Sequence, residues 1–254
     1  MSIQSVERAV GILQVLAASS RKLSLAEVAS GVGLAKTTVF GLLKTLQEQG
    51  FVEQDAETGK YQIGHALLEL GSRYLDASEL RRRALVWSDW LAQRSGESVR
   101  VGVLRSGSAL IVHHVFRPDN TLQILEVGQQ RPLHATALGK ALLAHQPEVL
   151  GDLPDPLPRL TRHTHIKRAE VTEDFNGVLE RGYALEREEA VLAEGGIAAP
   201  IFDHQGQVIG AIGINGALEA LFPRGEAQRQ LCALVAEAAH NISRELLSGR
   251  GVSP

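Results

Sequence analysis

The 254-residue sequence contains a single cysteine, Cys232. One cysteine cannot form a disulfide within the chain or a cysteine cage around a metal, so we expect a reducing compartment, the cytoplasm. The sequence also lacks a run of 18 apolar residues and a charged-then-apolar leader. We therefore expect no membrane-spanning helix and no signal peptide. The hydrophobic fraction of 44% is sufficient for the cores of one large domain or two smaller ones.

A positive overall charge, which would favour nucleic-acid binding, is also missing, because the formal net charge is −3. Residues 1–75 hold seven Lys or Arg and seven Asp or Glu, so the N-terminal part is neutral. The acidic residues are unevenly spaced, however, and none occurs between Glu27 and Glu48. A local field in this stretch can attract phosphate even when the average charge does not.

Residues 24–50 show the pattern of two helices joined by a tight turn. Ser24 followed by Glu27 is a capping box, which predicts a helix to about residue 30. Glycines at positions 31 and 33 end it, and a second helix is predicted over residues 35–50. Apolar residues at i, i+3, i+4 and i+7 place one stripe of the second helix in a core; they are Val39, Leu42, Leu43 and Leu46.

Two short alternating segments, residues 51–53 and 60–63, follow the second helix and predict a hairpin around a turn at residues 55–59. Helix, turn, helix and hairpin in this order indicate a winged helix-turn-helix, whose second helix enters the DNA major groove. The face opposite the leucine stripe offers hydrogen-bond donors, an apolar contact for a thymine methyl and a slim surface. The alternative is a solvated helix face. We predict DNA binding by Lys36, Thr37, Thr38, Phe40, Gly41 and Lys44.

The remaining periodic segments divide the chain near residues 75–80. Helices are predicted over residues 5–18, 65–74, 78–95, 136–145, 171–181 and 228–247. Strands are predicted over residues 99–104, 109–116, 122–127, 183–188, 196–203 and 208–215. Strands flanked by helices in this order indicate an α+β domain with antiparallel hairpins. The predicted division is a DNA-binding domain at residues 1–76, a linker helix at 77–95 and an effector-binding domain at 96–254.

Two sets of motifs resemble the IclR family of bacterial transcriptional regulators. The first comprises SVERAV at residues 5–10, LAKTTVFGLLKTL at 34–46 and YQIG at 61–64. The second comprises PLHATALGKA at 132–141 and GIAAPI at 196–201. The resemblance implies an α+β chain with an N-terminal winged helix-turn-helix, a linker helix and a C-terminal GAF-like effector-binding domain. It also implies a homodimer or homotetramer that binds double-stranded operator DNA and a small-molecule metabolite effector, with no cofactor.

The same resemblance implies where the effector binds. By position, its pocket is lined by Ala137, Leu138, Glu186, Gly196, Gly213 and Asn215. The sequence departs here from better-known members, in which an aspartate is common at position 186, a cysteine at 196 and serines at 213 and 215. The two glycines imply more room than a glyoxylate-sized ligand needs, and a leucine in place of Gly213 is expected to block the pocket.

Two features of this pocket have alternative interpretations. The loop at residues 131–136 precedes a helix whose free N–H groups favour an anion, which would make the loop an effector cradle. It is otherwise an ordinary helix start capped by Thr136. Glu186 either accepts hydrogen bonds from ligand hydroxyls or is a solvated charge in an acidic run with Glu188 and Glu189.

The histidines and Cys232 do not indicate chemistry of their own. His113 and His114 are adjacent in a predicted strand and point to opposite faces, while His163 and His165 lie in an irregular segment, so no metal site is predicted. Cys232 lies in an apolar helical pattern typical of a core. No serine or cysteine has a base at recognised motif spacing, and no enzyme activity is predicted.

We therefore expect a cytoplasmic, ligand-responsive transcription factor with a palindromic operator. Within the family, residues 83–87 and 112–119 most resemble the members that regulate glycerol catabolism. This resemblance implies a repressor that glycerol or glycerol 3-phosphate relieves. Two alternatives stay open. One is a regulator of aromatic-acid or other carboxylate catabolism, and the other is a metabolite-processing enzyme fused to a DNA-binding domain.

Overall fold

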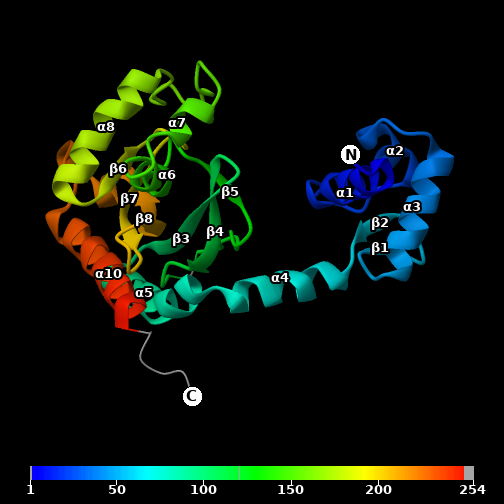
Figure 1. Ribbon diagram of the computed structural model, residues 1–254, viewed down its shortest axis with the longest axis horizontal. Coiled ribbons are helices and arrows are strands. Elements are labelled where there is room, and N and C mark those ends of the chain that lie inside the picture. The colour runs from blue at the N-terminus through cyan, green and yellow to red at the C-terminus, as the bar shows by residue number, and fades with distance from the viewer. Residues whose placement is uncertain (1, 120, 249–254) are drawn as a thin grey trace. The chain divides into compact units, whose positions relative to one another are not determined.

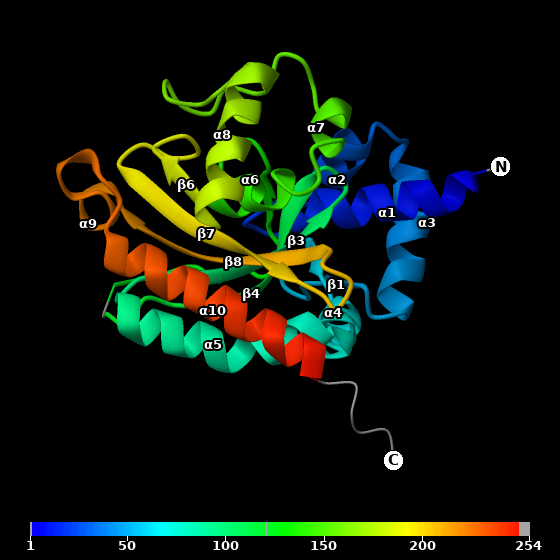
Figure 2. The same cartoon turned by 60° about the vertical axis from the view of Figure 1, so that its left-hand side comes forward.

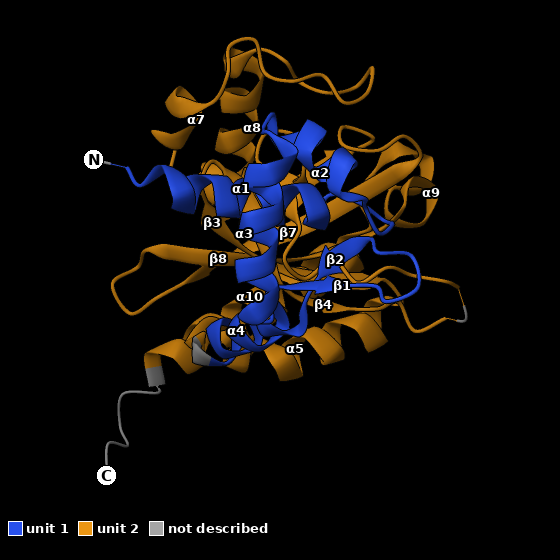
Figure 3. Cartoon of the chain, turned by 90° about the vertical axis from the view of Figure 1, so that its right-hand side faces the viewer, with its two compact units in different colours: residues 1–77 blue, residues 78–254 orange. Residues whose placement is uncertain are grey.

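The computed structural model describes residues 2–119 and 121–248. The chain folds as two compact units, residues 1–77 and residues 78–254 (Figure 3). Each unit contains a hydrophobic core of its own.

The N-terminal unit is a small helical bundle with a two-stranded hairpin. Its elements in chain order are α1 (Gln4–Ala17), α2 (Leu25–Val32), α3 (Lys36–Glu48), β1 (Val52–Gln54), β2 (Tyr61–Ile63) and α4 (His65–Ala77) (Figure 1). The predicted helix-turn-helix and hairpin are thus confirmed, and the antiparallel strands pair Val52 with Ile63. The predicted stripe of α3 lies in the core, where Val39, Leu43 and Leu46 pack with residues of α1 and α2.

Local sequence determines the turn between α2 and α3. The capping box at Ser24 forms as predicted: the Ser24 hydroxyl accepts the N–H of Glu27, and the Glu27 carboxylate accepts the N–H of Ser24. The helix ends at Gly33, whose φ of 65° is left-handed and unstrained only for glycine. The next helix can therefore start three residues later in a new direction.

The C-terminal unit is built on a six-stranded sheet with the strand order β5-β4-β3-β8-β7-β6, in which all neighbours are antiparallel. The strands are β3 (Ser98–Arg105), β4 (Ser108–Val115), β5 (Gln130–Pro132), β6 (Ala184–Arg187), β7 (Glu194–Phe202) and β8 (Val208–Ala217). The helices are α5 (Glu79–Ser95), α6 (Ala137–Leu143), α7 (Val149–Asp152), α8 (Arg168–Arg181), α9 (Leu218–Leu221) and α10 (Arg229–Ser248), with a 3-10 turn at Pro223–Gly225. The predicted α+β class is confirmed.

Helices cover both faces of this sheet. α5 and α10 lie side by side on one face, and α6 and α8 lie over the other (Figure 2). The Trp87 indole on α5 donates a hydrogen bond to the Glu245 carboxylate on α10, with an N···O distance of 2.8 Å. Leu80 and Leu91 of α5 are buried in the C-terminal unit. The helix predicted as a linker therefore packs as part of the C-terminal unit, and the division between the units falls after residue 77.

One predicted strand, residues 122–127, is wrong. The structure has no strand there, and the apolar side chains of Leu122, Ile124 and Leu125 are exposed. The free edge of β4 is instead paired further along the chain, where Ile111 exchanges backbone hydrogen bonds with Gly128 and Gln129 and β5 follows. β5 covers only Ser108–Leu110. Beyond it, side chains take up the backbone groups that strand pairing would need: the Glu126 N–H donates to His114 Nδ1, and the Gln123 amide accepts the N–H of Arg117 and donates to its carbonyl.

None of the helices in the described ranges is both long and apolar enough to cross a membrane.

Candidate functional sites

The first candidate site is the outer face of α3. All six residues predicted to bind DNA are exposed there, and Phe40 retains 53% of its accessible surface. A large aromatic side chain left in water on a helix face beside two lysines is unusual unless a partner covers it. A Cβ built at Gly41 would meet nothing within 4 Å, so the backbone of α3 is open to close approach.

The second candidate site is a cavity of about 170 Å³ on the α6 side of the six-stranded sheet. Strands, one helix start and two loops contribute to it, and these are far apart in the sequence. Its lining residues are Arg100, Glu126, Arg131, Thr136, Leu138, Glu186, Ala190, Val191, Glu194 and Asn215.

Two arginines on one side of the cavity share a single carboxylate. Arg100 on β3 and Arg131 on β5 contact opposite oxygens of Glu126, at 2.6 Å and 2.5 Å respectively. Burial raises the pKa of Glu126, but its hydrogen bonds to the arginines outweigh this and the net pKa lies below the usual value. Glu126 is therefore ionised at neutral pH, and the cluster retains one net positive charge.

Glu186 on β6 faces the cavity from the other side and is only 2% exposed. One of its oxygens, Oε1, accepts the backbone N–H groups of Glu189 at 3.0 Å and Ala190 at 3.3 Å. Burial raises its pKa to about 7. The interpretation of Glu186 as a solvated charge is therefore wrong, and near neutral pH a large share of the group is a neutral acid whose second oxygen can donate a proton.

The side chain of Thr136 caps the start of α6. Thr136 Oγ1 accepts the N–H of Gly139 at 3.1 Å and donates to the carbonyl of Pro132 at 2.7 Å. The predicted Thr136 cap is thus present, and it satisfies the N–H of Gly139. Arg100 and Arg131 add positive charge to the cavity.

The six residues predicted from the family pattern have different positions. Leu138, Glu186 and Asn215 line the cavity. Ala137 and Gly196 lie just behind them: a Cβ on Gly196 would come within 3.2 Å of Ala137 and Glu186 and within 3.0 Å of Asn215.

Gly213 is not among the lining residues. A Cβ there would lie 2.7 Å from the Cβ of Ala198 and from the carbonyl of Ile197. The glycine permits close packing against β7, and it leaves no open space toward a ligand. A leucine at this position would disrupt the sheet, so the expectation that it would only block the pocket does not hold.

The sequence interpretation missed the charged residues of the cavity. Arg100, Glu126, Arg131 and Glu194 come from three strands and a loop that only the sheet register brings together. One signal was present for Arg100, because it is the only charged residue within the apolar segment at residues 99–104. A charge in a buried strand usually has a partner or a ligand.

A buried lysine lies behind the cavity. Lys140 on α6 is 2% exposed, and its Nζ contacts Asp174 of α8 at 2.8 Å and Glu189 at 2.6 Å. Glu189 is the residue whose N–H holds Glu186. The backbone carbonyl of Glu189 also accepts the hydroxyl of Thr164 at 2.7 Å. Lys140 therefore connects α6, α8 and the loop that positions the cavity carboxyl.

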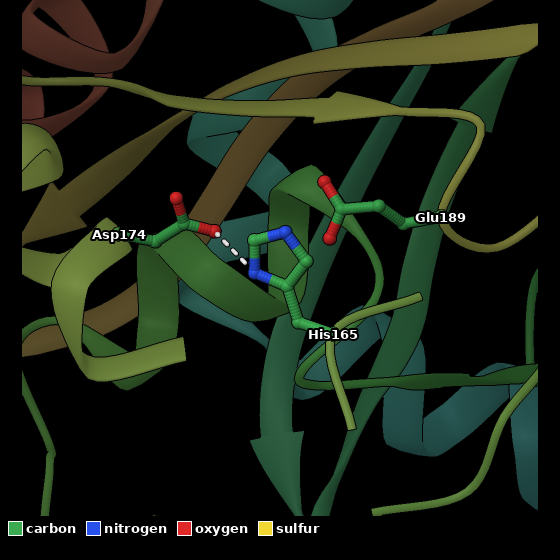
Figure 4. A group of neighbouring side chains, drawn as sticks. All are labelled: His165, Asp174 and Glu189. Atoms are coloured by element: carbon green, nitrogen blue, oxygen red, sulfur yellow. Dashed lines mark ion pairs between the residues drawn. The ribbon is translucent and has the colours of Figure 1, made fainter. Parts of the chain in front are cut away.

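The cluster of His165, Asp174 and Glu189 is the one group in the described ranges with metal-ligand spacing (Figure 4). The Lys140 ammonium already contacts both of its carboxylates, so a cation entering the cluster would meet a positive charge. His163, the other histidine of this segment, lies near Glu188 instead. Cys232 is buried, as predicted.

Comparison with protein families decides the class of the chain. The family model for the IclR helix-turn-helix domain matches residues 5–56, and the model described as bacterial transcriptional regulator IclR C-terminal matches residues 72–244. The chain belongs to the IclR family of transcriptional regulators. IclR membership confirms the predicted class, a DNA-binding helix-turn-helix regulator rather than an enzyme.

Several curated IclR proteins are similar over the full length. The glycerol operon regulatory protein of Streptomyces coelicolor is 48% identical over 254 residues, covering 98% of both chains. That of Streptomyces griseus is 45% identical, also covering 98% of both chains. The HTH-type transcriptional regulator XynR of Escherichia coli is 31% identical and covers 84% of this chain and 86% of its own.

Solved structures agree on the fold. An IclR regulator from Alicyclobacillus acidocaldarius superposes with a TM-score of 0.82 at 24% identity, covering 99% of this chain and 100% of that one. An IclR homologue from Microbacterium hydrocarbonoxydans, solved in complex with 4-hydroxybenzoate, gives 0.83 at 24% identity, with coverage of 96% and 100%.

Proposed function

We propose that this IclR regulator represses a glycerol catabolic operon in the bacterial cytoplasm and that glycerol or glycerol 3-phosphate relieves the repression. The observation that carries the proposal is the full-length similarity, at 48% and 45% identity, to two glycerol operon regulatory proteins. We further propose that the chain binds a palindromic operator as a homodimer or homotetramer, in keeping with α3 as a recognition helix whose half-sites lie on successive turns of DNA.

The cavity chemistry supports a hydroxylated ligand. Each hydroxyl both donates and accepts. Asn215 and the acid form of Glu186 offer both functions, and the guanidinium groups of Arg100 and Arg131 add donors. Its volume of about 170 Å³ suits a small metabolite. Leu138, Ala190 and Val191 supply only a limited apolar surface, which fits a short carbon chain.

A second candidate effector is an aromatic or other carboxylate. The observation that favours it is the arginine pair, since Arg100 and Arg131 could hold a carboxylate if Glu126 moved aside. The 4-hydroxybenzoate complex of the Microbacterium homologue shows that a protein of this fold holds such a ligand. None of the described residues that line the cavity is aromatic and able to stack on a ring, so we rank this candidate second.

The proposed mechanism is linkage between two sites. Effector and operator change each other's affinity by the same factor, because effector binding favours a placement of the recognition helices that fits the operator less well. A panel of glycerol, glycerol 3-phosphate and 4-hydroxybenzoate separates the candidates. We expect one of the first two to raise the melting temperature and to release operator DNA in gel-shift titration. Stabilisation by 4-hydroxybenzoate alone would reverse the ranking.

We expect Lys36→Ala and Lys44→Ala each to weaken operator binding and to leave folding intact, because both side chains lie on the exposed face of α3. If each lysine neutralises a phosphate, its loss should lower the salt slope of binding by about 1. Lys167→Ala, in the C-terminal unit with a side chain 75% exposed, is the matched control. Unchanged affinity and slope in both α3 variants would contradict this placement of the DNA-binding face.

We expect Gly196→Ala to weaken effector binding by about tenfold, the effect of overpacking a tight site by one methyl group. The added Cβ would come within 3.2 Å of Glu186 and 3.0 Å of Asn215. Gly151→Ala is the control, because a Cβ there meets nothing within 4 Å. Calorimetric titration of both variants checks the result, and wild-type affinity in folded Gly196→Ala would place the effector elsewhere.

A further inference from the structure

A second chamber of about 310 Å³ adjoins the effector cavity. The two spaces share four lining residues, Arg100, Glu126, Glu194 and Asn215. Beyond these, the second chamber is bordered by Ser98, His114, Arg117, Gln123, Ile124, Ala193, Gly216 and Ala217. A ligand that extends past Arg100 and Asn215 from the first cavity would enter it.

Two unused hydrogen-bond donors belong to residues of this chamber. His114 and Arg100 are cross-strand partners on β4 and β3, so their side chains project from the same face of the sheet. Within the described ranges, His114 Nε2 and Arg100 Nε are buried side-chain nitrogens without a hydrogen-bond partner. Buried polar groups are almost always paired, so two neighbouring orphans indicate a partner from outside the chain.

The protonation of His114 can be inferred from its surroundings. Its Nδ1 accepts the backbone N–H of Glu126 at 3.2 Å, which leaves the proton of the neutral ring on Nε2. Burial lowers the pKa of His114, and Arg100 and Arg131 lower it further against the opposing charge of Glu126. Phe116 packs edge-on against the ring, with centroids 5.0 Å apart, and fixes its orientation. Nε2–H is thus a positioned donor at neutral pH.

The charged side chains around the chamber leave it suited to a ligand that accepts hydrogen bonds. Glu126 is engaged by two arginines, and Arg117 pairs with Asp119 at 2.8 Å. Glu194 lies at the exposed rim. Among the described residues that line the chamber, the unmet groups are therefore N–H donors. The Glu97 carboxyl, whose Oε2 is also unpaired, lies against Gly216, and burial raises its pKa, which favours its uncharged form. An oxyanion is the chemistry that satisfies both donors at once.

We propose that the second chamber binds a terminal oxyanion of the effector, held by His114 Nε2–H and Arg100 Nε–H, while its hydroxyl groups occupy the first cavity near Glu186 and Asn215. This inference rests on the proposed function for the hydroxylated part of the ligand. Its consequence is selectivity: a three-carbon polyol carrying a phosphate or carboxylate binds more tightly than the uncharged polyol.

Two substitutions at His114 separate the Nε2–H donor from the acceptor Nδ1, which holds the backbone N–H of Glu126. In His114→Asn, the side-chain oxygen replaces Nδ1 as acceptor for Glu126, but the distal donor is lost. In His114→Gln, the amide nitrogen can take the place of Nε2–H. Calorimetric titration of the full-length chain uses glycerol, glycerol 3-phosphate, glycerate and inorganic phosphate at matched ionic strength, and thermal unfolding confirms folding.

We expect wild-type protein to bind glycerol 3-phosphate or glycerate at least tenfold more tightly than glycerol. His114→Asn should lose about tenfold or more of the anion affinity, the usual scale for one hydrogen bond to a charged group. It should leave glycerol affinity unchanged, and His114→Gln should restore most of the loss. The tighter of the two anions identifies phosphate or carboxylate as the terminal group.

Other outcomes distinguish the two proposals. If the polyols and their anions all fail but inorganic phosphate stabilises wild-type protein and not His114→Asn, the oxyanion site stands and the glycerol assignment fails. If glycerol binds as tightly as the anions, or if His114→Asn binds anions as wild-type protein does, the oxyanion site is overturned. Failure of every anion to bind wild-type protein overturns it as well.

Discussion

Lys140→Met is expected to lower the free energy of unfolding of the C-terminal unit by about 3–5 kcal/mol, the usual cost of removing one partner from a buried ion pair. The lysine is 2% exposed, and the substitution would leave the buried Glu189 carboxylate without its cation. Asp174 is 30% exposed and can be solvated, so it contributes the smaller part of the loss. Urea unfolding followed by fluorescence measures the difference.

Two further variants test whether the loss comes from the unpaired charge. Asp174→Asn should cost less than 1 kcal/mol, in line with partly exposed ion pairs. Adding Glu189→Gln to Lys140→Met should recover stability, because the buried charge is then gone. A loss under about 1 kcal/mol for Lys140→Met, or no recovery in the double variant, would show that the contacts of Lys140 do not carry this energy.

Lys140→Met should also weaken ligand binding in the proposed effector cavity. Lys140 holds the Glu189 side chain, and the Glu189 backbone N–H holds Glu186 Oε1 at 3.0 Å. A loop released from Lys140 would place the cavity carboxyl less precisely. Binding losses from poorly held polar groups are expected to exceed those from lost apolar contact in this cavity.

The N-terminal unit could be predicted almost completely from sequence because its signals are local. A capping box at Ser24, a left-handed glycine at position 33 and one apolar period over α3 determine the helices and the turn. The face of α3 opposite this buried apolar stripe is then predicted to be exposed. No long-range pairing is needed to identify these elements.

The candidate effector cavity could be predicted only in part. Leu138, Glu186 and Asn215 came from the family pattern, but Arg100 and Arg131 required the register of β3, β4 and β5. Gly213 shows the opposite error, since a missing side chain implies room only if no neighbour fills it, and Ala198 does. The strand expected at residues 122–127 does not form, because the side chains of His114 and Gln123 take up backbone groups that strand pairing would use.

Glu186 is expected to make the stability of the chain depend on pH. Its pKa is raised from 4.5 to about 7, chiefly by burial and also by the charge of Glu189, against opposing backbone N–H bonds and the charge of Lys140. Arg100, Arg131, Glu126 and Glu194 face it across the cavity.

The sign of the effect follows from proton binding. Between pH 4.5 and 7 the unfolded chain has lost the proton of Glu186 while the folded chain retains it, so the free energy of unfolding falls as pH rises. A shift of this size corresponds to a loss of about 3 kcal/mol, complete above the folded pKa. Above pH 7 both states are ionised and this contribution is constant.

Glu186→Gln isolates this contribution from all other titrating groups. The amide keeps the shape and an acceptor for the Glu189 N–H, but it does not ionise. We therefore expect the difference in unfolding free energy between the variant and wild-type protein to grow in favour of the variant from pH 5 to 7.5 and then level off. The affinity of wild-type protein for glycerol, which does not ionise in this range, should fall over the same interval as the acid form of Glu186 disappears, while that of Glu186→Gln stays constant. Parallel stability curves for the two proteins would show that Glu186 is ionised in the folded state throughout, and its assignment as the hydrogen-bond donor to the effector would then be wrong.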